Sequence, residues 1–307
     1  MNQTTFCTAW ILMILFGAST FGQSDQASED WRTVHSDVVY GHKAGMALTY
    51  DVITPVKEKS NGAGVLFMVS GGWNSRWSNP NYVVREKPPV NKNMFEKLVQ
   101  AGFTVYMVRH GSAPRFKVPE AVSDVRKAVR HIRYNAKSYA VDPNRIGVCG
   151  GSAGGHLSLM LGTTGKAGKE KPQRERDAGT QVAAVVAYFP PTNLEGLMND
   201  RELVRRFPAL DFDEDRASSV SPIKQVTSDD APTLLIHGNK DRLVQLSHSR
   251  NIKKVFDEKH VENELIVIEG AGHGFRGENQ QRAEKALVEW FEKYLTEGES
   301  ESGQGNR

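Results

Sequence analysis

The hydrophobic positions of this chain follow two patterns that alternate along most of its length. Short apolar runs at residues 103–108 and 182–188 predict strands that are covered on both faces of a sheet. An alternating stretch at residues 46–53 predicts an outer antiparallel strand. Segments with a helical period are predicted at residues 94–100, 119–138, 247–258 and 283–294. Strands that alternate with helices indicate an α/β fold with a mostly parallel, doubly wound sheet and helices on both faces.

One apolar run leads into a glycine-rich turn that carries a serine. After Val148 and Cys149, the chain reads Gly-Gly-Ser-Ala-Gly-Gly from residue 150, which contains a G-x-S-x-G match around Ser152 and opens a helix-like segment. In this context the motif predicts a nucleophile elbow, where the serine backbone is strained and the residues two positions away must be small. For the motif taken alone, a glycine-rich turn that carries a serine by chance is the alternative.

Two later strands end in loops that carry an acid and a histidine. The run at residues 233–236 leads to Asp241, and the run at residues 265–268 leads to His273 on a glycine-flanked loop. A serine nucleophile needs a base to accept its proton and a carboxylate to orient that base. The order Ser152, Asp241, His273 is the order of an α/β-hydrolase triad.

The other histidines near predicted strand ends have competing interpretations. His237 precedes a tight turn and is interpreted as structural, and His156 is expected to pack or to support the site from behind. His110 ends the strand at residues 103–108, so we predict that it lies on the rim of the site and contacts the substrate.

A tetrahedral intermediate requires preorganised N–H donors for its oxyanion. Ala153, the residue after the nucleophile, is one expected donor. Gly71 and Gly72 follow the apolar run at residues 64–69 and are the other expected donors, with a plain structural turn as the alternative. Trp73, next in the chain, is predicted to contact the substrate.

These motifs together resemble a known branch of the α/β-hydrolases, the hormone-sensitive-lipase-like and acetyl-xylan or feruloyl-esterase-like serine esterases. The resemblance covers residues 45–295 and also includes the segments at 141–148 and 221–223. The chain departs from the family's His-Gly-Gly-Gly-Trp, which reads Val-Ser-Gly-Gly-Trp at residues 69–73. It also departs from the family's Tyr-Arg-Leu-Ala-Pro, which reads His-Gly-Ser-Ala-Pro at residues 110–114.

The resemblance implies a serine carboxylesterase that works through an acyl-enzyme and needs no metal or cofactor. Residues 193–229 are expected to form a small cap insertion with an acidic middle, which predicts short acyl groups on a carbohydrate or aryl alcohol. Two alternatives stay open: a serine peptidase that resembles the prolyl-oligopeptidase catalytic domain, and a non-catalytic module that binds carbohydrate or a protein partner.

Composition and charge fit an ordinary enzyme domain. The chain has 307 residues, 39% of them hydrophobic, which is enough for one large core. Its 39 basic and 36 acidic residues leave a net charge of +3, so no nucleic-acid partner is expected. The run at residues 166–177 has mixed sign and is interpreted as a solvated loop.

The N-terminus is interpreted as an export signal. Residues 9–16 form an apolar core that is too short to span a bilayer, and small residues follow it. Residues 1–22 are therefore predicted to be a cleaved signal peptide, which leaves a secreted or periplasmic protein without a stable membrane span; an uncleaved anchor is the alternative. The predicted divisions are a leader at 23–40, the hydrolase domain at 41–296 and a disordered tail at 297–307.

Overall fold

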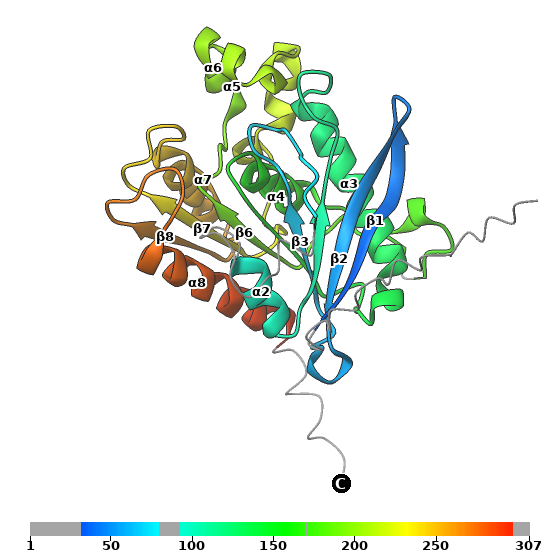
Figure 1. Cartoon of the computed structure of the whole chain (residues 1–307). Coiled ribbons are helices and arrows are strands. Elements are labelled where there is room, and N and C mark those ends of the chain that lie inside the picture. The colour runs from blue at the N-terminus through cyan, green and yellow to red at the C-terminus, as the bar shows by residue number, and fades with distance from the viewer. Residues whose placement is uncertain (1–31, 80–92, 170, 297–307) are drawn as a thin grey trace, which may run out of the picture. The chain divides into compact units, whose positions relative to one another are not determined.

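The computed structural model describes residues 32–79, 93–169 and 171–296. One eight-stranded sheet runs through this part of the chain, in the order β1-β2-β4-β3-β5-β6-β7-β8 (Figure 1). β1 and β2 pair antiparallel, β2 and β4 pair antiparallel, and every later pair is parallel. The strands are Arg32–Lys43, Met46–Pro55, Gly64–Met68, Thr104–Val108, Ile146–Gly151, Ala184–Tyr188, Thr233–Gly238 and Asn263–Ile268. The mostly parallel sheet predicted from the sequence is confirmed.

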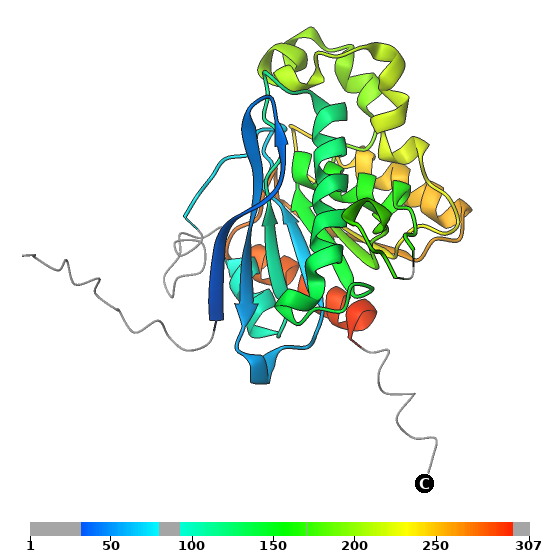
Figure 2. The ribbon, with the colours of Figure 1, turned by 90° about the vertical axis from the view of Figure 1, so that its right-hand side faces the viewer.

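Helices cover both faces of the sheet. α3, α4 and α7 pack on one face, and α2 and α8 pack on the other (Figures 1 and 2). Their bounds are Asn93–Gln100 for α2, Val118–Asn135 for α3, Ala153–Thr164 for α4, Ser247–Glu258 for α7 and Gly277–Leu295 for α8. The sheet is therefore doubly wound.

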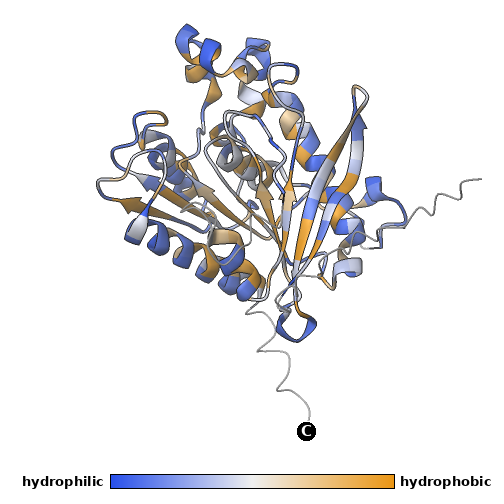
Figure 3. Ribbon diagram, in the orientation of Figure 1, coloured by the Kyte–Doolittle hydropathy of each residue, from blue (hydrophilic) through white to orange (hydrophobic). Residues whose placement is uncertain are grey.

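Each central strand contributes to two hydrophobic cores. In β4, Val105 and Met107 point to the core under α2 and α8, whereas Tyr106 and Val108 point to the core under α3 and α4. Because successive side chains of a strand alternate between faces, a strand covered on both faces is apolar at most of its positions. Figure 3 shows these central strands as hydrophobic, and all five residues of β4 and of β6 are buried.

The first strand begins earlier than the sequence predicts. β1 starts at Arg32, so residues 32–40 belong to the sheet and the predicted leader boundary at residue 40 is wrong. β1 is an edge strand whose side chains are mostly exposed, so it lacks the apolar run that marks the inner strands. Because β1 pairs with it on the outer side, β2, which was predicted to be the outer strand, lies one position inside the edge of the sheet. The predicted signal peptide, the rest of the leader and the tail lie outside the described residues.

An insertion between β6 and β7 carries short helices above the carboxyl edge of the sheet. It contains α5, Leu194–Met198, and α6, Arg201–Arg206, followed by single turns of 3-10 helix (Figure 1). Leu194 and Leu210 are buried in the core that α3 and α4 share, so apolar contacts hold the insertion in place. In the ranges that the structure describes, no helix has both the length and the apolar character needed to cross a bilayer.

Candidate active site

The chain turns sharply at Ser152, between the end of β5 and the start of α4. Ser152 has φ 55° and ψ −122°, a conformation that residues with a side chain rarely adopt. Its N–H donates to the Tyr188 carbonyl at 2.9 Å, and its carbonyl accepts from the His156 N–H at 2.9 Å. These bonds fix the strained backbone at the carboxyl edge of the sheet, as a nucleophile elbow requires.

The glycines around Ser152 are required by close backbone contacts. A Cβ atom built on Gly150 would lie 2.6 Å from the Gly154 carbonyl carbon. A Cβ atom on Gly154 would lie 2.6 Å from the Met68 carbonyl oxygen of β3. Real Cβ atoms do not approach backbone atoms so closely, so the turn can form only with glycine at both positions.

Asp241 and His273 meet because they follow neighbouring parallel strands. β7 and β8 pair in register and end at the same edge of the sheet. His273 Nδ1 lies 2.7 Å from Asp241 Oδ2. Since an ionised carboxylate only accepts hydrogen bonds, Nδ1 carries the proton, and Nε2 of a neutral His273 is left with a free lone pair. The pair thus has the tautomer that a general base needs.

The Asp241 carboxyl is held in place on both of its oxygens. Its side chain is fully buried, and Oδ1 accepts from the N–H groups of Leu243 at 2.9 Å and Val244 at 3.0 Å. Burial alone would raise the pKa of Asp241, but hydrogen bonds from His237, from His273 and from the Val244 N–H outweigh it and hold that pKa well below its ordinary value. Asp241 therefore stays ionised at neutral pH.

His237 also lies against the Asp241 carboxylate, at the same oxygen as His273. Its Nε2 lies 3.4 Å from Asp241 Oδ2 and 2.9 Å from the Val244 carbonyl, and its Nδ1 lies 2.8 Å from Ser249 Oγ. The side chain is completely buried. Both ring nitrogens are occupied, which agrees with the structural role predicted for this residue.

His273 lies at the mouth of the site with 22% of its side chain exposed. The Phe189 ring packs against its imidazole, with ring centroids 4.5 Å apart. Within the part of the chain that the structure describes, the Ser152 hydroxyl makes no hydrogen bond to His273. Bonds between a nucleophile and its base are often long before a substrate binds and tighten in the reacting complex. Phe189 was not predicted as a site residue; its position after β6, at the same edge as the triad residues, is the sequence signal that could have found it.

The candidate oxyanion donors differ in whether their N–H groups already have a hydrogen-bond partner. The Ala153 N–H lies in the first turn of α4, where helix N–H groups have no partner within the helix. The Gly71 N–H donates to the Asn74 carbonyl at 2.9 Å, so in this conformation it is already used. The Gly72 N–H makes no hydrogen bond to any described residue. Gly72 has φ 58°, and a Cβ atom there would lie 2.7 Å from the ring of Phe207, which comes from the insertion.

Trp73 is not at the surface of the site, in contrast to the prediction. Only 4% of it is exposed, and its indole N–H donates to His156 Nδ1 at 3.2 Å. His156 in turn donates from Nε2 to the Val220 carbonyl at 2.7 Å, and burial lowers the pKa of His156 to about 4. Trp73 therefore ties the oxyanion loop to α4 and to the insertion.

His110 is also buried rather than exposed on the rim. It is 4% exposed, and its Nδ1 lies 2.8 Å from the Gly111 carbonyl, so Nδ1 carries the proton. Its Nε2 therefore accepts from the Ser70 hydroxyl at 2.8 Å. Ser70, which stands where the resembling family has glycine, lines the cavity beside His273. His110 positions Ser70, and the sequence did not predict this contact.

A cavity of about 580 Å³ opens beside His273. Its walls combine apolar side chains from four different segments with polar groups from the start of α8. The apolar side chains are Phe67, Met94, Tyr188, Phe189 and Phe275, and the polar ones include Asn279, Gln280 and Glu284. The cavity has the size and the mixed character of a small-molecule site.

Comparison with known proteins identifies a family and curated relatives of this chain. The BD-FAE family model matches residues 50–256. The esterase LipC of Mycobacterium tuberculosis is 28% identical over 251 residues, which cover 78% of this chain and 59% of LipC. The chain spans about half the length of the curated relatives it matches.

Solved structures share the fold. A carbohydrate esterase from gut microbiota, in a truncated form, has a TM-score of 0.69 and 26% identity, covering 88% of this chain and 99% of its own. An acetyl ester-xyloside bifunctional hydrolase from Caldicellulosiruptor lactoaceticus has a TM-score of 0.69 and 22% identity, covering 84% of this chain and 96% of its own. The architecture is that of the α/β-hydrolases, as the sequence predicts.

Proposed function

The chain belongs to the BD-FAE family, and from this premise we propose that it is a serine carboxylesterase acting on short-chain acyl esters of carbohydrate or aryl alcohols. The observation that carries the proposal is the His273–Asp241 bond of 2.7 Å at the edge of the sheet where Ser152 forms its strained turn. This arrangement supplies a nucleophile, a base with the correct tautomer and a buried carboxylate.

The reaction follows from these groups. Ser152 Oγ attacks the ester carbonyl while His273 Nε2 takes its proton, and the Ala153 and Gly72 N–H groups stabilise the oxyanion. His273 then protonates the leaving alcohol as the acyl-enzyme forms. A water molecule, deprotonated by His273, attacks the acyl-enzyme and releases the acid, and the proton returns to Ser152. Asp241 keeps His273 oriented and stabilises its protonated form throughout.

Several features support the substrate class. The cavity beside His273 has aromatic walls and polar groups at the start of α8, which suit an aryl ring or a sugar. The gut carbohydrate esterase, at 26% identity, is a relative whose name points to carbohydrate esters. Phe207 packs directly over Gly72 and limits the space above the oxyanion loop, which favours short acyl groups.

The test is a hydrolysis screen of purified protein over p-nitrophenyl acetate, butyrate and decanoate, with acetylated and feruloylated sugars. We expect acetyl and butyryl esters to have kcat/KM values about tenfold or more above decanoate. The Ser152→Ala protein is the control and should lose this activity. Preference for decanoate would indicate a lipase instead, and cleavage of an acylated amino-acid anilide in preference to every ester would indicate a peptidase.

We also propose that the protein is exported. The apolar core at residues 9–16, followed by small residues, supports cleavage near residue 22. The mass and N-terminal sequence of the mature protein, measured after expression in a host that recognises the signal, test this. A product that keeps residues 1–22 would contradict cleavage.

A further inference from the structure

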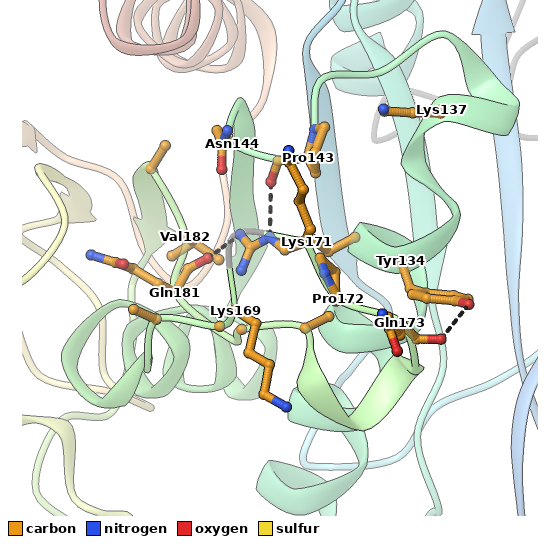
Figure 4. Close-up of a pocket in the computed structure, with 16 residues that line it drawn as sticks. Tyr134, Lys137, Pro143, Asn144, Lys169, Lys171, Pro172, Gln173, Gln181 and Val182 are labelled. Atoms are coloured by element: carbon orange, nitrogen blue, oxygen red, sulfur yellow. Dashed lines mark hydrogen bonds between the residues drawn. The ribbon is translucent and has the colours of Figure 1, made fainter.

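Two cavities lie on either side of the segment that joins α4 to β6, away from the candidate active site. One, of about 890 Å³, is lined by the end of α3, by the turn before β5 and by this segment (Figure 4). The other, of about 530 Å³, is lined by α3, by the end of α4 and by the same segment. Ser152 stands at the other end of α4, about 18 Å away at 1.5 Å per residue.

Cations dominate both cavities. The cationic cleft, as we name the two cavities together, is lined by Arg133, Lys137, Lys169 and Lys171 in the first and by Arg126, Arg130, Lys166 and Arg176 in the second. Among the described lining residues the one carboxylate is Asp177, which already pairs with Lys169 at 3.2 Å and with Arg174 at 3.2 Å. Since the whole chain carries only +3, these lining residues hold more net positive charge than the chain as a whole, and the remainder is net negative.

Two of these arginines are partly buried without an acidic partner. Arg126 and Arg130 lie one turn apart on α3, and neither forms an ion pair with a described residue. Arg126 donates from Nη2 to Thr164 Oγ1 at 2.5 Å, while its buried Nε makes no hydrogen bond to any described residue. Burial and the charge of Arg130 both lower the pKa of Arg126. Like charges at this spacing repel, so a bound anion would stabilise the pair.

Arg133, in the first cavity, is also a partly buried cation that forms no ion pair with a described residue. Its Nε donates to the Pro143 carbonyl at 2.8 Å and its Nη2 donates to the Gln181 carbonyl, so backbone oxygens rather than a carboxylate hold it. Burial lowers the pKa of Arg133 to about 10. Arg126, Arg130 and Arg133 are thus placed by the fold, and none of the three has an acidic partner among the described residues.

The segment that carries the lysines is fixed by backbone contacts. Thr180 N–H donates to the Lys166 carbonyl at 2.8 Å, and Lys169 N–H donates to the Asp177 carbonyl at 2.9 Å. A Cβ atom on Gly168 would lie 2.1 Å from the Gly179 nitrogen, so the two arms of the segment touch. The described residues of the predicted solvated loop at 166–177 are mostly exposed, as predicted, and these backbone contacts fix where the segment lies.

We propose that the cationic cleft binds an acidic polysaccharide, a sugar chain that bears carboxylates. Cations in two adjoining cavities match an extended chain with repeated charges better than a single small anion. Single-stranded nucleic acids stack on rows of aromatic side chains, whereas Tyr134 is the one aromatic residue among the described lining residues, and its hydroxyl is bound to the Gln173 carbonyl at 3.1 Å. Membrane-surface binding favours an apolar face beside the cations, and Tyr134 is the one large exposed apolar side chain described there.

The cleft would tether the enzyme to its substrate. It lies near the amino ends of β5 and β6, at the opposite edge of the sheet from Ser152, so it does not form part of the catalytic pocket. Holding one part of a polymer there raises the local concentration of ester groups near the triad. This catalytic benefit depends on the proposed esterase function, whereas binding itself does not.

The test measures binding of polygalacturonate, which carries carboxylates and no ester, by isothermal titration calorimetry at low salt. Wild-type and Ser152→Ala proteins should bind equally. The pair Arg126→Gln with Arg130→Gln should weaken binding about tenfold or more, because charge-assisted contacts are lost. The pair Lys254→Gln with Lys285→Gln removes the same charge from exposed positions on α7 and α8 and should change binding less than about twofold.

Measurements of ester hydrolysis and of folding show whether the arginine pair variant has lost binding alone. The arginine pair variant should keep the wild-type kcat/KM for a small soluble ester. If it fails to fold, the pair Lys166→Gln with Arg176→Gln tests the same cavity from the other segment. The proposal is overturned if polygalacturonate does not bind, or if neither the Arg126 and Arg130 pair nor the Lys166 and Arg176 pair weakens its binding when replaced. It is also overturned if a single-stranded oligonucleotide, or vesicles containing phosphatidylglycerol, bind more tightly than polygalacturonate. Polymer binding that persists in a protein with no ester activity would count against the proposed function alone.

Discussion

Two histidines reach the same carboxylate from different strand ends, and their surroundings differ. His237, at the end of β7, is completely buried and uses both ring nitrogens in contacts with Ser249, Val244 and Asp241. His273, beyond β8, binds Asp241 through Nδ1 and has 22% of its side chain exposed. The buried histidine has no group left for chemistry, whereas Nε2 of the partly exposed one makes no hydrogen bond to a described residue.

The difference shows how one site can be both stable and reactive. His237 and the Leu243 and Val244 N–H groups hold the Asp241 carboxylate before His273 contributes anything. Asp241 is therefore preorganised to orient the imidazole that must carry a proton. Preorganised charge that needs no rearrangement during reaction is the main source of electrostatic catalysis.

The most decisive test of the difference between His237 and His273 is to replace each histidine with glutamine. His273→Gln should lower kcat by about a million-fold, as loss of a triad base does elsewhere. His237→Gln removes only support for Asp241, so it should cost at most about a hundredfold in kcat but destabilise the fold by about 1–3 kcal/mol. Steady-state kinetics and chemical denaturation of both variants measure this. Equal kinetic losses would show that His237 is not merely structural.

Removing the charge between the two histidines should have the next largest effect. In Asp241→Asn, the amide oxygen can accept from the Leu243 and Val244 N–H groups, which leaves the amide nitrogen facing His273. His273 would then favour the tautomer with the proton on Nε2, and kcat should fall by about ten-thousand-fold while the fold persists. Circular dichroism checks the fold and single-turnover kinetics the rate. A wild-type rate would require another carboxylate to orient His273.

A third histidine, His156, should make the free energy of unfolding depend on pH. It is fully buried, and its pKa of about 4 lies below the ordinary value of about 6.5 that it regains on unfolding. Between these values the unfolded chain binds the proton and the folded chain does not, so the free energy of unfolding falls as pH falls. The expected loss from this group between pH 6.5 and pH 4 is about 3 kcal/mol.

Thermal or denaturant unfolding at pH 7 and pH 4.5 measures this loss. His156→Gln can still donate to the Val220 carbonyl and accept from Trp73, so it serves as the matched variant without a titrating group. Its stability should depend less on pH than that of the wild-type protein. Parallel pH dependence in the two proteins would show that His156 is not the group responsible.

Much of the fold was predictable because burial on both faces leaves a plain signature. β4 and β6 appear as continuous apolar runs, and the G-x-S-x-G turn is recognisable because backbone contacts at Gly150 and Gly154 exclude every larger residue. Asp241 and His273 come together by parallel pairing of β7 and β8. Strand ends on one edge of the sheet were enough to predict which residues meet.

Other features depend on contacts between distant segments, which local sequence does not reveal. β1 was missed because an edge strand with mostly exposed side chains has no apolar run. Trp73 and His110 follow strands at the active edge, yet partners from α4 and from the oxyanion loop bury them. The cationic cleft unites α3 with a segment of mixed charge, so its excess of cations appears only when the two are brought together.

The most direct test of the central claim is covalent labelling with a fluorophosphonate, followed by peptide mass spectrometry. Such probes react with a serine hydroxyl that a neighbouring base activates. We predict one adduct per chain on Ser152, formed far more slowly in His273→Gln than in His237→Gln, whose labelling rate should fall by at most about a hundredfold. No adduct, or an adduct on another serine such as Ser70, would contradict the assignment of Ser152, Asp241 and His273 as the catalytic triad.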